Sequence, residues 1–199
     1  MSAKGFSMRT TMIVLTLLLS AGCGGEGVDW SQPETLIVRE KSATTDEGVQ
    51  LQYWSLLDAT CQQVFDALAD VEHYPEFIPG VDSVQLMGQT DNSKTVLIAQ
   101  RIISRQTSAK VEWTFSRAPL RVDFKTLTSD FAFNDGSYTF EPSPDGTRCL
   151  VHFTFLMKPA KGAGAPSESA VTAETRTSFT AAIAGVKKRA ASLAAGRSG

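Results

Sequence analysis

The chain has 199 residues, of which 42% are hydrophobic and 20% charged, and its formal net charge is −2. This length suits one domain, and the hydrophobic content is sufficient for a packed core, which excludes a largely disordered chain. The only basic cluster, Lys187–Arg189, falls near the end of an expected helix, where cations interact favourably with the helix dipole. A mildly acidic chain of this kind has no charge pattern for binding nucleic acid.

The N-terminal segment has the three parts of a secretory signal peptide. Lys4 and Arg9 give it a positive start, residues 10–19 form an apolar run, and small residues then lead into Cys23. The run is about half of the roughly 20 residues that cross a bilayer, so it does not predict a membrane span. The segment resembles a lipobox, which predicts a lipoprotein signal peptide over residues 1–22 and lipidation of Cys23. The alternative is an ordinary signal peptide cleaved nearby, with Cys23 incidental.

Lipidated Cys23 would anchor the mature protein in the cell envelope, because two or more acyl chains bind a membrane stably. Residues 23–48 are then expected to form a lipidated tether and linker that begins with a flexible glycine-rich stretch. Aspartate after the lipidated cysteine commonly retains bacterial lipoproteins in the inner membrane, and none follows Cys23. The sequence therefore favours the periplasmic face of the outer membrane. Removal of Lys4 and Arg9 changes the formal net charge from −2 to −4.

The mature chain begins with a strand and continues with two short helices. Residues 49–57 alternate between apolar and polar side chains, which is typical of a strand with one wet face. Thr60 and Gln63 form a capping-box pattern that starts a helix over 60–73. Pro75 disfavours helical geometry in the residue before it, so this helix cannot run far past that point. A second short helix is expected over 76–78.

Residues 81–157 predict a run of six antiparallel strands. Turn residues separate several of the expected strands, which cover 81–89, 94–104, 108–116, 120–128, 131–141 and 147–157. The alternation is clearest around Trp113, which shares one face with Phe115, whereas Glu112 lies on the other. By the same alternation Asp123 is expected to face outward, opposite Phe124.

A long helix over 167–195 is expected to cover the dry face of this sheet. Its apolar positions fall on one stripe, formed by Val171, Thr175, Phe179, Ile183, Val186 and Leu193. At 1.5 Å per residue such a helix is about 40 Å long, enough to cross a curved sheet from edge to edge.

This order of elements, together with Tyr74–Phe77 and Pro79–Val81 after the first helix, resembles the START-like (SRPBCC) superfamily. The most similar branch is the polyketide cyclase and coenzyme Q-binding START group, whose late hairpin resembles Gly136–Phe140 followed by Asp145–Thr147. The resemblance implies an α+β helix-grip fold over 49–195, with about seven antiparallel strands curved around the C-terminal helix. A lipocalin-like barrel is the main alternative, but lipocalins lack a helix between their first two strands.

The helix-grip fold implies an apolar cavity between the sheet and the long helix. Its expected wall consists of Trp113, Phe115, Phe124, Phe140 and Phe179, although aromatic side chains on such a face also occur as plain core. The expected function is that of an envelope lipoprotein that binds or carries a hydrophobic small molecule of the lipid or quinone class. The alternatives are a cyclase or aromatase-type enzyme and a non-catalytic lipoprotein for protein interaction.

Residues for catalysis and metal binding are scarce in the sequence. His73 lies between the short helices and His152 inside a strand, and neither is spaced for a nucleophile–base pair. His152 is expected on the outer face. No metal-ligand spacing and no phosphate-binding glycine loop occurs, so the sequence predicts no cofactor and no catalytic constellation.

The other two cysteines, Cys61 and Cys149, are brought near one another by the helix-grip order, in which the first strand pairs with the last. An oxidising compartment allows them to pair. A disulfide between them is the hypothesis, and two buried free thiols are the alternative.

Overall fold

The computed structural model describes residues 28–102, 105–129, 132–159 and 168–196. The expected signal peptide and Cys23 lie outside these residues. The chain divides into two compact units, Met1–Gln32 and Pro33–Gly199, and the described part of the first is a short turn closed by Ser31 donating to the Asp29 carboxylate. Within the described ranges no helix is long and apolar enough to cross a membrane.

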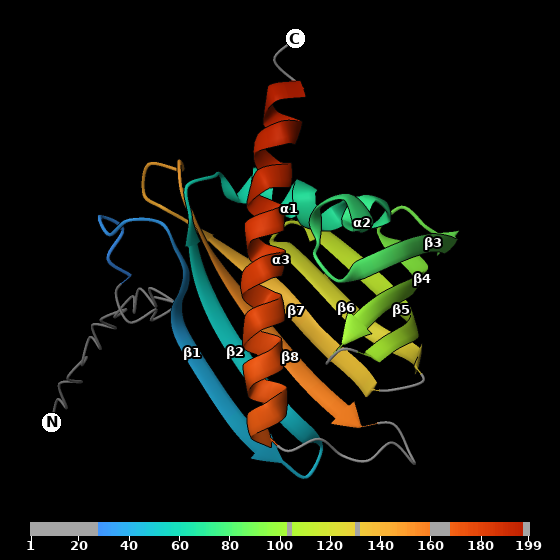
Figure 1. The fold of residues 1–199 in the computed structure, drawn as a ribbon. Coiled ribbons are helices and arrows are strands. Elements are labelled where there is room, and N and C mark those ends of the chain that lie inside the picture. Colours follow the sequence, from blue (N-terminus) through green and yellow to red (C-terminus); the bar gives the residue numbers. More distant parts are fainter. Residues whose placement is uncertain (1–27, 103–104, 130–131, 160–167, 197–199) are drawn as a thin grey trace, which may run out of the picture. The chain divides into compact units, whose positions relative to one another are not determined.

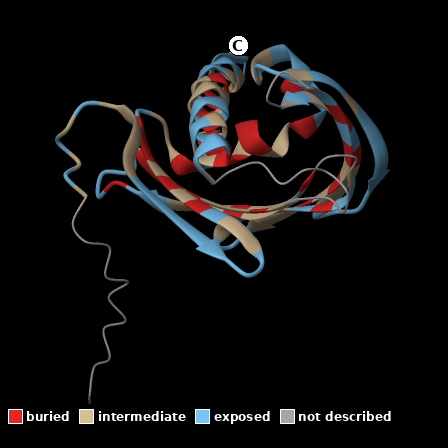
Figure 2. Ribbon diagram, turned by 60° about the horizontal axis from the view of Figure 1, so that its bottom comes forward, coloured by how far each residue is buried: buried red, intermediate tan, exposed pale blue. Residues whose placement is uncertain are grey.

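The second unit is built on one antiparallel sheet, in which eight strands are described. Their order across the sheet is β1-β2-β8-β7-β6-β5-β4-β3, so the first strand and the third form its two edges. The strands are β1 (Thr35–Thr45), β2 (Gly48–Leu57), β3 (Val81–Gln89), β4 (Ser93–Ile102), β5 (Arg105–Arg117), β6 (Leu120–Ser129), β7 (Ala132–Pro142) and β8 (Cys149–Pro159). The sheet is strongly curved, and Figure 2 shows the helices inside its concave face.

Strand β1 extends the sheet to residues that precede the expected domain start at residue 49. It occupies Thr35–Thr45, inside the segment expected to be linker, and pairs with β2 along most of its length. The Ser55 hydroxyl donates to the Leu36 carbonyl, and Leu36 and Ile37 pack against the core. The sheet therefore has one strand more than expected, and the short helices follow the second strand. The apolar run Leu36–Val38 indicates the start of this strand in the sequence, but its second half is exposed, as suits an edge strand, and was not expected.

The first helix, α1 (Cys61–Ala69), begins where the capping box predicts. The Thr60 hydroxyl accepts from the Gln63 backbone N–H at 3.3 Å, and the Gln63 side chain accepts from the Thr60 N–H at 2.9 Å. The helix ends earlier than expected, at Ala69, and after Asp70 the chain continues as the 3₁₀ turn η1 (Val71–His73) and α2 (Tyr74–Phe77). Pro75 stands in the first turn of α2, where its missing N–H costs no helical hydrogen bond.

The long helix α3 (Glu168–Gly196) lies across the concave face of the sheet (Figure 1). Its buried hydrophobic positions are Val171, Phe179, Ile183, Val186 and Ala190, which keep the helical spacing of the expected stripe. Ion pairs attach its exposed sides to the rest of the unit. Arg176 reaches Glu40 of β1 at 2.8 Å. The curved antiparallel sheet with α3 on its concave face confirms the expected α+β helix-grip architecture.

Candidate ligand cavity

Strand register brings the large inner-face side chains into rows across the sheet. Trp113 of β5 lies opposite Phe124 of β6, which in turn lies opposite Gly136 of β7. In the neighbouring row Tyr138 of β7 lies opposite Phe153 of β8. Side chains directly opposite one another share a face, so these residues meet under α3.

Between these rows and α3 lies a cavity of about 250 Å³. Strands β4 to β8, helix α3 and the turn between α2 and β3 contribute to its wall. The wall is mainly apolar, and its aromatic members are Tyr74, Trp113, Phe124, Tyr138, Phe153, Phe155 and Phe179. A curved sheet and a straight helix cannot touch along their whole length, and the cavity occupies the resulting gap.

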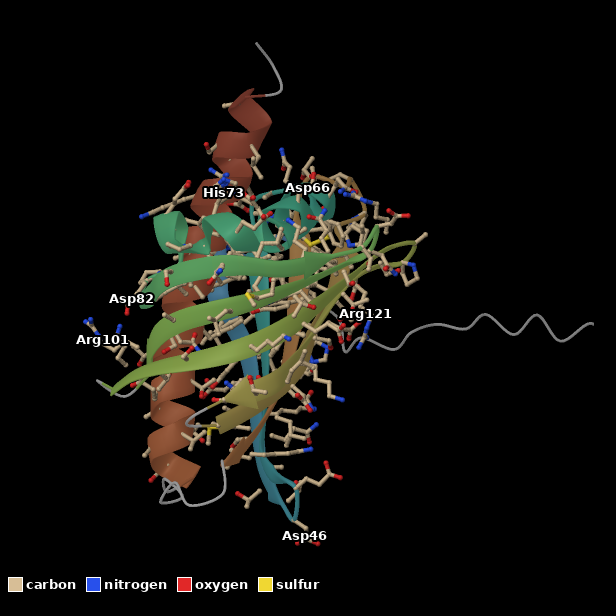
Figure 3. The ribbon with its side chains drawn as sticks, turned by 90° about the vertical axis from the view of Figure 1, so that its right-hand side faces the viewer. Asp46, Asp66, His73, Asp82, Arg101 and Arg121 are labelled. Atoms are coloured by element: carbon tan, nitrogen blue, oxygen red, sulfur yellow. A yellow bond between two sulfur atoms is a disulfide. The ribbon has the colours of Figure 1, made fainter. Side chains whose placement is uncertain are left out.

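The cavity opens beside the turn between α2 and β3. The lining residues Gly80, Arg101 and Ser178 are exposed to solvent, whereas Trp113, Phe153 and Phe179 are buried. The Arg101 backbone N–H donates to the Gly80 carbonyl at 2.8 Å, which attaches the turn to the end of β4. Figure 3 shows Arg101 projecting outward at this side of the sheet. The opening of the cavity therefore carries the cationic side chain of Arg101, and the interior behind it is mainly apolar.

The structure places three of the five expected wall residues in the cavity lining, namely Trp113, Phe124 and Phe179. The other two, Phe115 and Phe140, correct the expectation. They meet the ring of Phe65 edge-on, with centroid distances of 6.5 Å and 6.0 Å, because α1 covers that end of the sheet. Both are core residues on the correct face but at the filled end.

Four aromatic wall residues were not predicted from the sequence, namely Tyr74, Tyr138, Phe153 and Phe155. Phe153 stacks on Phe179 of α3 at 5.0 Å and lies 4.8 Å from the ring of Tyr138. The alternation of apolar residues within the last strand is a signal that could have identified Phe153 and Phe155. Tyr138 lay inside the hairpin that carried the family resemblance but was not assigned to the wall.

Known proteins share both the sequence pattern and the fold. Residues 57–183 match the family described as polyketide cyclase / dehydrase and lipid transport. The chain belongs to this family, within the START-like superfamily. The description covers both cyclases and lipid transport, so membership alone is compatible with an enzyme or a carrier. No curated protein matches the chain.

Several solved structures share the START-like fold. The aromatase/cyclase Zhui from Streptomyces sp. R1128 is 13% identical, with a TM-score of 0.64 over 76% of this chain and 94% of its own. A STAR-related lipid transfer protein from Xanthomonas axonopodis is 15% identical, with a TM-score of 0.59 over 76% and 92%. Human StAR-related lipid transfer protein 5 is 13% identical, with a TM-score of 0.59 over 81% and 86%. At these identities the likeness is one of fold.

Charged groups are few in the START-like cavity. Its charged lining residues in the described part of the chain are Arg101 and Glu174. The Tyr74 hydroxyl donates to the Leu68 carbonyl at 2.7 Å, and burial raises the pKa of Tyr74 well above its ordinary value. Burial likewise raises the pKa of Tyr138, so both phenols remain protonated at neutral pH. The described residues contain no cluster of three or more histidine, cysteine or acidic side chains for a metal.

The START-like domain contains the hypothesised disulfide. The sulfur atoms of Cys61 and Cys149 are bonded, with their Cα atoms 4.9 Å apart and 88 residues between them in sequence. Cys61 begins α1 and Cys149 begins β8, opposite Leu57 at the end of β2. The bond therefore attaches the helix that fills one end of the concave face to the start of β8, an inner strand of the sheet.

The remaining candidate residues lie away from the cavity. His152 is on the outer face, where it stacks on Trp54 at 4.2 Å, and burial together with Arg39 and Lys41 lowers its pKa. His73 binds the Asp70 carboxylate through Nδ1 at 2.6 Å on the exposed side of η1. Neither histidine is a lining residue. Glu112 and Asp123 are likewise absent from the lining, in agreement with their expected outward orientation.

Proposed function

We propose that this protein is an envelope lipoprotein whose START-like domain binds or carries a hydrophobic small molecule of the lipid or quinone class. The observation that carries the ligand proposal is the apolar cavity of about 250 Å³ beneath α3. Dry apolar cavities of about 150 Å³ already bind a molecule as large as benzene. A cavity of this size and lining therefore accommodates the apolar part of a lipid or a small aromatic molecule.

Membership of a family whose description includes lipid transport supports a protein that carries its ligand rather than one that keeps a lipid permanently bound. The opening beside Gly80 and Arg101 gives such a ligand a route between cavity and solvent. Because the entrance lies between a turn and a helix, a long ligand can remain partly outside. The cavity volume therefore limits the part of the ligand that is enclosed, not its full length.

Anchoring through Cys23 is the second part of the proposal. Its support is the signal-peptide pattern of residues 1–22 and the small residues directly before Cys23. The Cys61–Cys149 bond is consistent with an oxidising compartment, because disulfides persist outside the cytosol. The absence of aspartate after Cys23 favours the periplasmic face of the outer membrane.

The ligand proposal is tested by purifying the full chain from its native host and analysing it by native mass spectrometry and lipid extraction. We expect a defined lipid or quinone to accompany the folded protein. The matched control is Ala182→Phe, which places a large side chain in the wall formed by α3 and should lower the amount of ligand recovered. Circular dichroism must show that this variant is folded. A ligand-free mass from folded wild-type protein would contradict the proposal.

Anchoring is tested separately, by labelling cells with radioactive palmitate and fractionating their membranes. Wild-type protein should carry the label and sediment with outer membranes, whereas Cys23→Ser should carry none. Label that persists in Cys23→Ser, or wild-type protein without label, would refute lipidation at Cys23. Neither result bears on whether the cavity binds a ligand.

A further inference from the structure

Two hydrogen-bond donors in the cavity wall have no acceptor in the described parts of the chain. Trp113, which is 7% exposed, has an unpartnered indole Nε1. Tyr138 also lines the cavity, and no hydrogen bond from its hydroxyl occurs among the described residues. Buried donors are normally satisfied, and an acceptor on a ligand in the cavity would satisfy the Trp113 N–H.

The neighbouring phenol, Tyr74, provides a contrast within the same wall. Its hydroxyl donates to the Leu68 carbonyl at 2.7 Å, so its hydrogen-bonding capacity is used by the protein itself. Its ring meets Trp113 edge-on at 5.6 Å, and it is close enough to Tyr138 for that phenol to contribute to its raised pKa. The two unpartnered donors therefore lie around one satisfied tyrosine, in the same region of the wall.

Tyr138 is the donor best placed to meet a ligand. It is only partly buried although it lies on the concave face, so its accessible surface is turned toward the cavity. Its ring is held from two sides, by Phe124 at 6.1 Å and by Phe153 at 4.8 Å. Because burial raises its pKa, the hydroxyl keeps its proton and remains a donor at neutral pH.

The charges around the cavity restrict the acceptor that this donor can serve. Arg101 and Glu174 lie toward the mouth, and the described lining contains no lysine, histidine or aspartate. An ionised carboxylate or phosphate at the depth of Tyr138 would lose its hydration without gaining a cation. A neutral carbonyl oxygen loses much less hydration free energy on burial and still accepts a hydrogen bond from a phenol.

We infer that the enclosed part of the ligand bears an uncharged carbonyl oxygen, as in a ketone or an ester, which accepts a hydrogen bond from Tyr138. The Trp113 indole N–H is the second donor of this subsite. Hydrocarbon chains and ionised groups are disfavoured at this point of the wall. The inference rests on the proposed binding of a hydrophobic ligand and adds the chemical group by which that ligand is selected.

The test compares two probes of nearly equal shape, acetylnaphthalene and isopropenylnaphthalene, in which a methylene group replaces the ketone oxygen. The full chain is reconstituted in nanodiscs, and bound probe is measured by equilibrium dialysis against empty nanodiscs. Partition into the bilayer is the same for every variant, so differences between variants report the cavity. Tyr138→Phe removes only the hydroxyl. Tyr53→Phe is the matched control, since its buried hydroxyl is also unpartnered but the residue does not line the cavity.

We expect Tyr138→Phe to weaken binding of the ketone by about 3- to 10-fold, the contribution of one neutral hydrogen bond. Binding of the hydrocarbon should change by less than about twofold, and Tyr53→Phe should leave the affinities for both probes unchanged. An equal loss for both probes, or no loss for either, would overturn the carbonyl subsite and leave the proposed function intact. Failure of both probes to bind the wild-type protein would overturn the subsite and count against the proposed cavity function.

Discussion

The ring of Phe124 lies directly over Gly136, its cross-strand partner in the cavity wall. A Cβ atom at Gly136 would overlap this ring and the backbone carbonyl of Thr154. We therefore expect Gly136→Ala to lower the free energy of unfolding by about 2 kcal/mol, as overpacking of a filled site does. Urea unfolding followed by circular dichroism measures this change.

Two further variants separate this effect from a general cost of alanine in a strand. Gly88→Ala should be nearly neutral, because a Cβ there meets nothing within 4 Å. Phe124→Leu combined with Gly136→Ala should destabilise less than the sum of the two single changes, because the smaller side chain removes one of the two overlaps. Strict additivity would show that the ring is not the obstacle.

The Cys61–Cys149 bond closes a loop with a sequence separation of 88 residues. In the chain-entropy account a loop of this length contributes about 4 to 5 kcal/mol by restricting the unfolded chain. Cys61→Ala with Cys149→Ala should therefore lower the free energy of unfolding by an amount of this order. Thiol labelling of unfolded, unreduced wild-type protein is the control, and two reactive thiols from these positions would disprove the bond.

Asp70 links the end of α1 to α3 and makes stability depend on pH. Burial acts to raise the pKa of Asp70, but hydrogen bonds from His73 and Arg189 outweigh it and hold the pKa below its ordinary value of 3.8. The folded state thus favours the ionised carboxylate. This stabilisation is complete above the unfolded pKa and is lost as the pH falls through the lower folded pKa.

Asp70→Asn should accordingly lower the free energy of unfolding at neutral pH by about 1 kcal/mol, because a partly screened ion pair contributes no more than this. The difference from wild type should shrink below about pH 4, as the wild-type carboxylate becomes protonated. Glu76→Gln is the matched control, because Glu76 also faces Arg189 but at 3.6 Å and with 60% of its side chain exposed. An equal effect of the two variants would argue against a special role for Asp70.

Gly185 lets α3 approach the backbone of α2. A Cβ atom there would collide with the Phe77 carbonyl, which no side-chain rotation can relieve. Gly185→Ala should destabilise the domain by about 1 to 3 kcal/mol, although alanine is the better helix former. Ala184→Gly, at the adjacent position, measures the helix-propensity contribution alone, and thermal unfolding compares the two. Stabilisation by Gly185→Ala would show that the helices separate freely.

Several features followed from the sequence because they depend on neighbours along the chain. The capping box of Thr60 and Gln63 involves residues three apart, and it set the start of α1 correctly. Alternation with a period of two assigned Trp113 and Phe124 to the inner face, and helical spacing placed Phe179 opposite them. The order of these local elements, together with the motifs around Tyr74–Val81, resembles the START-like superfamily, and that resemblance implied the helix-grip architecture.

The tertiary structure decided what lies above each inner-face residue. Phe115 has the same alternation as Trp113, but α1 covers Phe115 whereas Trp113 borders the open cavity. Periodicity gives the face of a strand but not the position of a helix packed on it from far along the chain. For the same reason the unpartnered hydroxyl of Tyr138 could not be predicted, since its acceptor would have to come from another element. The local sequence determined the helices and strands and the inner face of each strand. Long-range packing determined which inner-face residues are covered by a helix and which border the cavity.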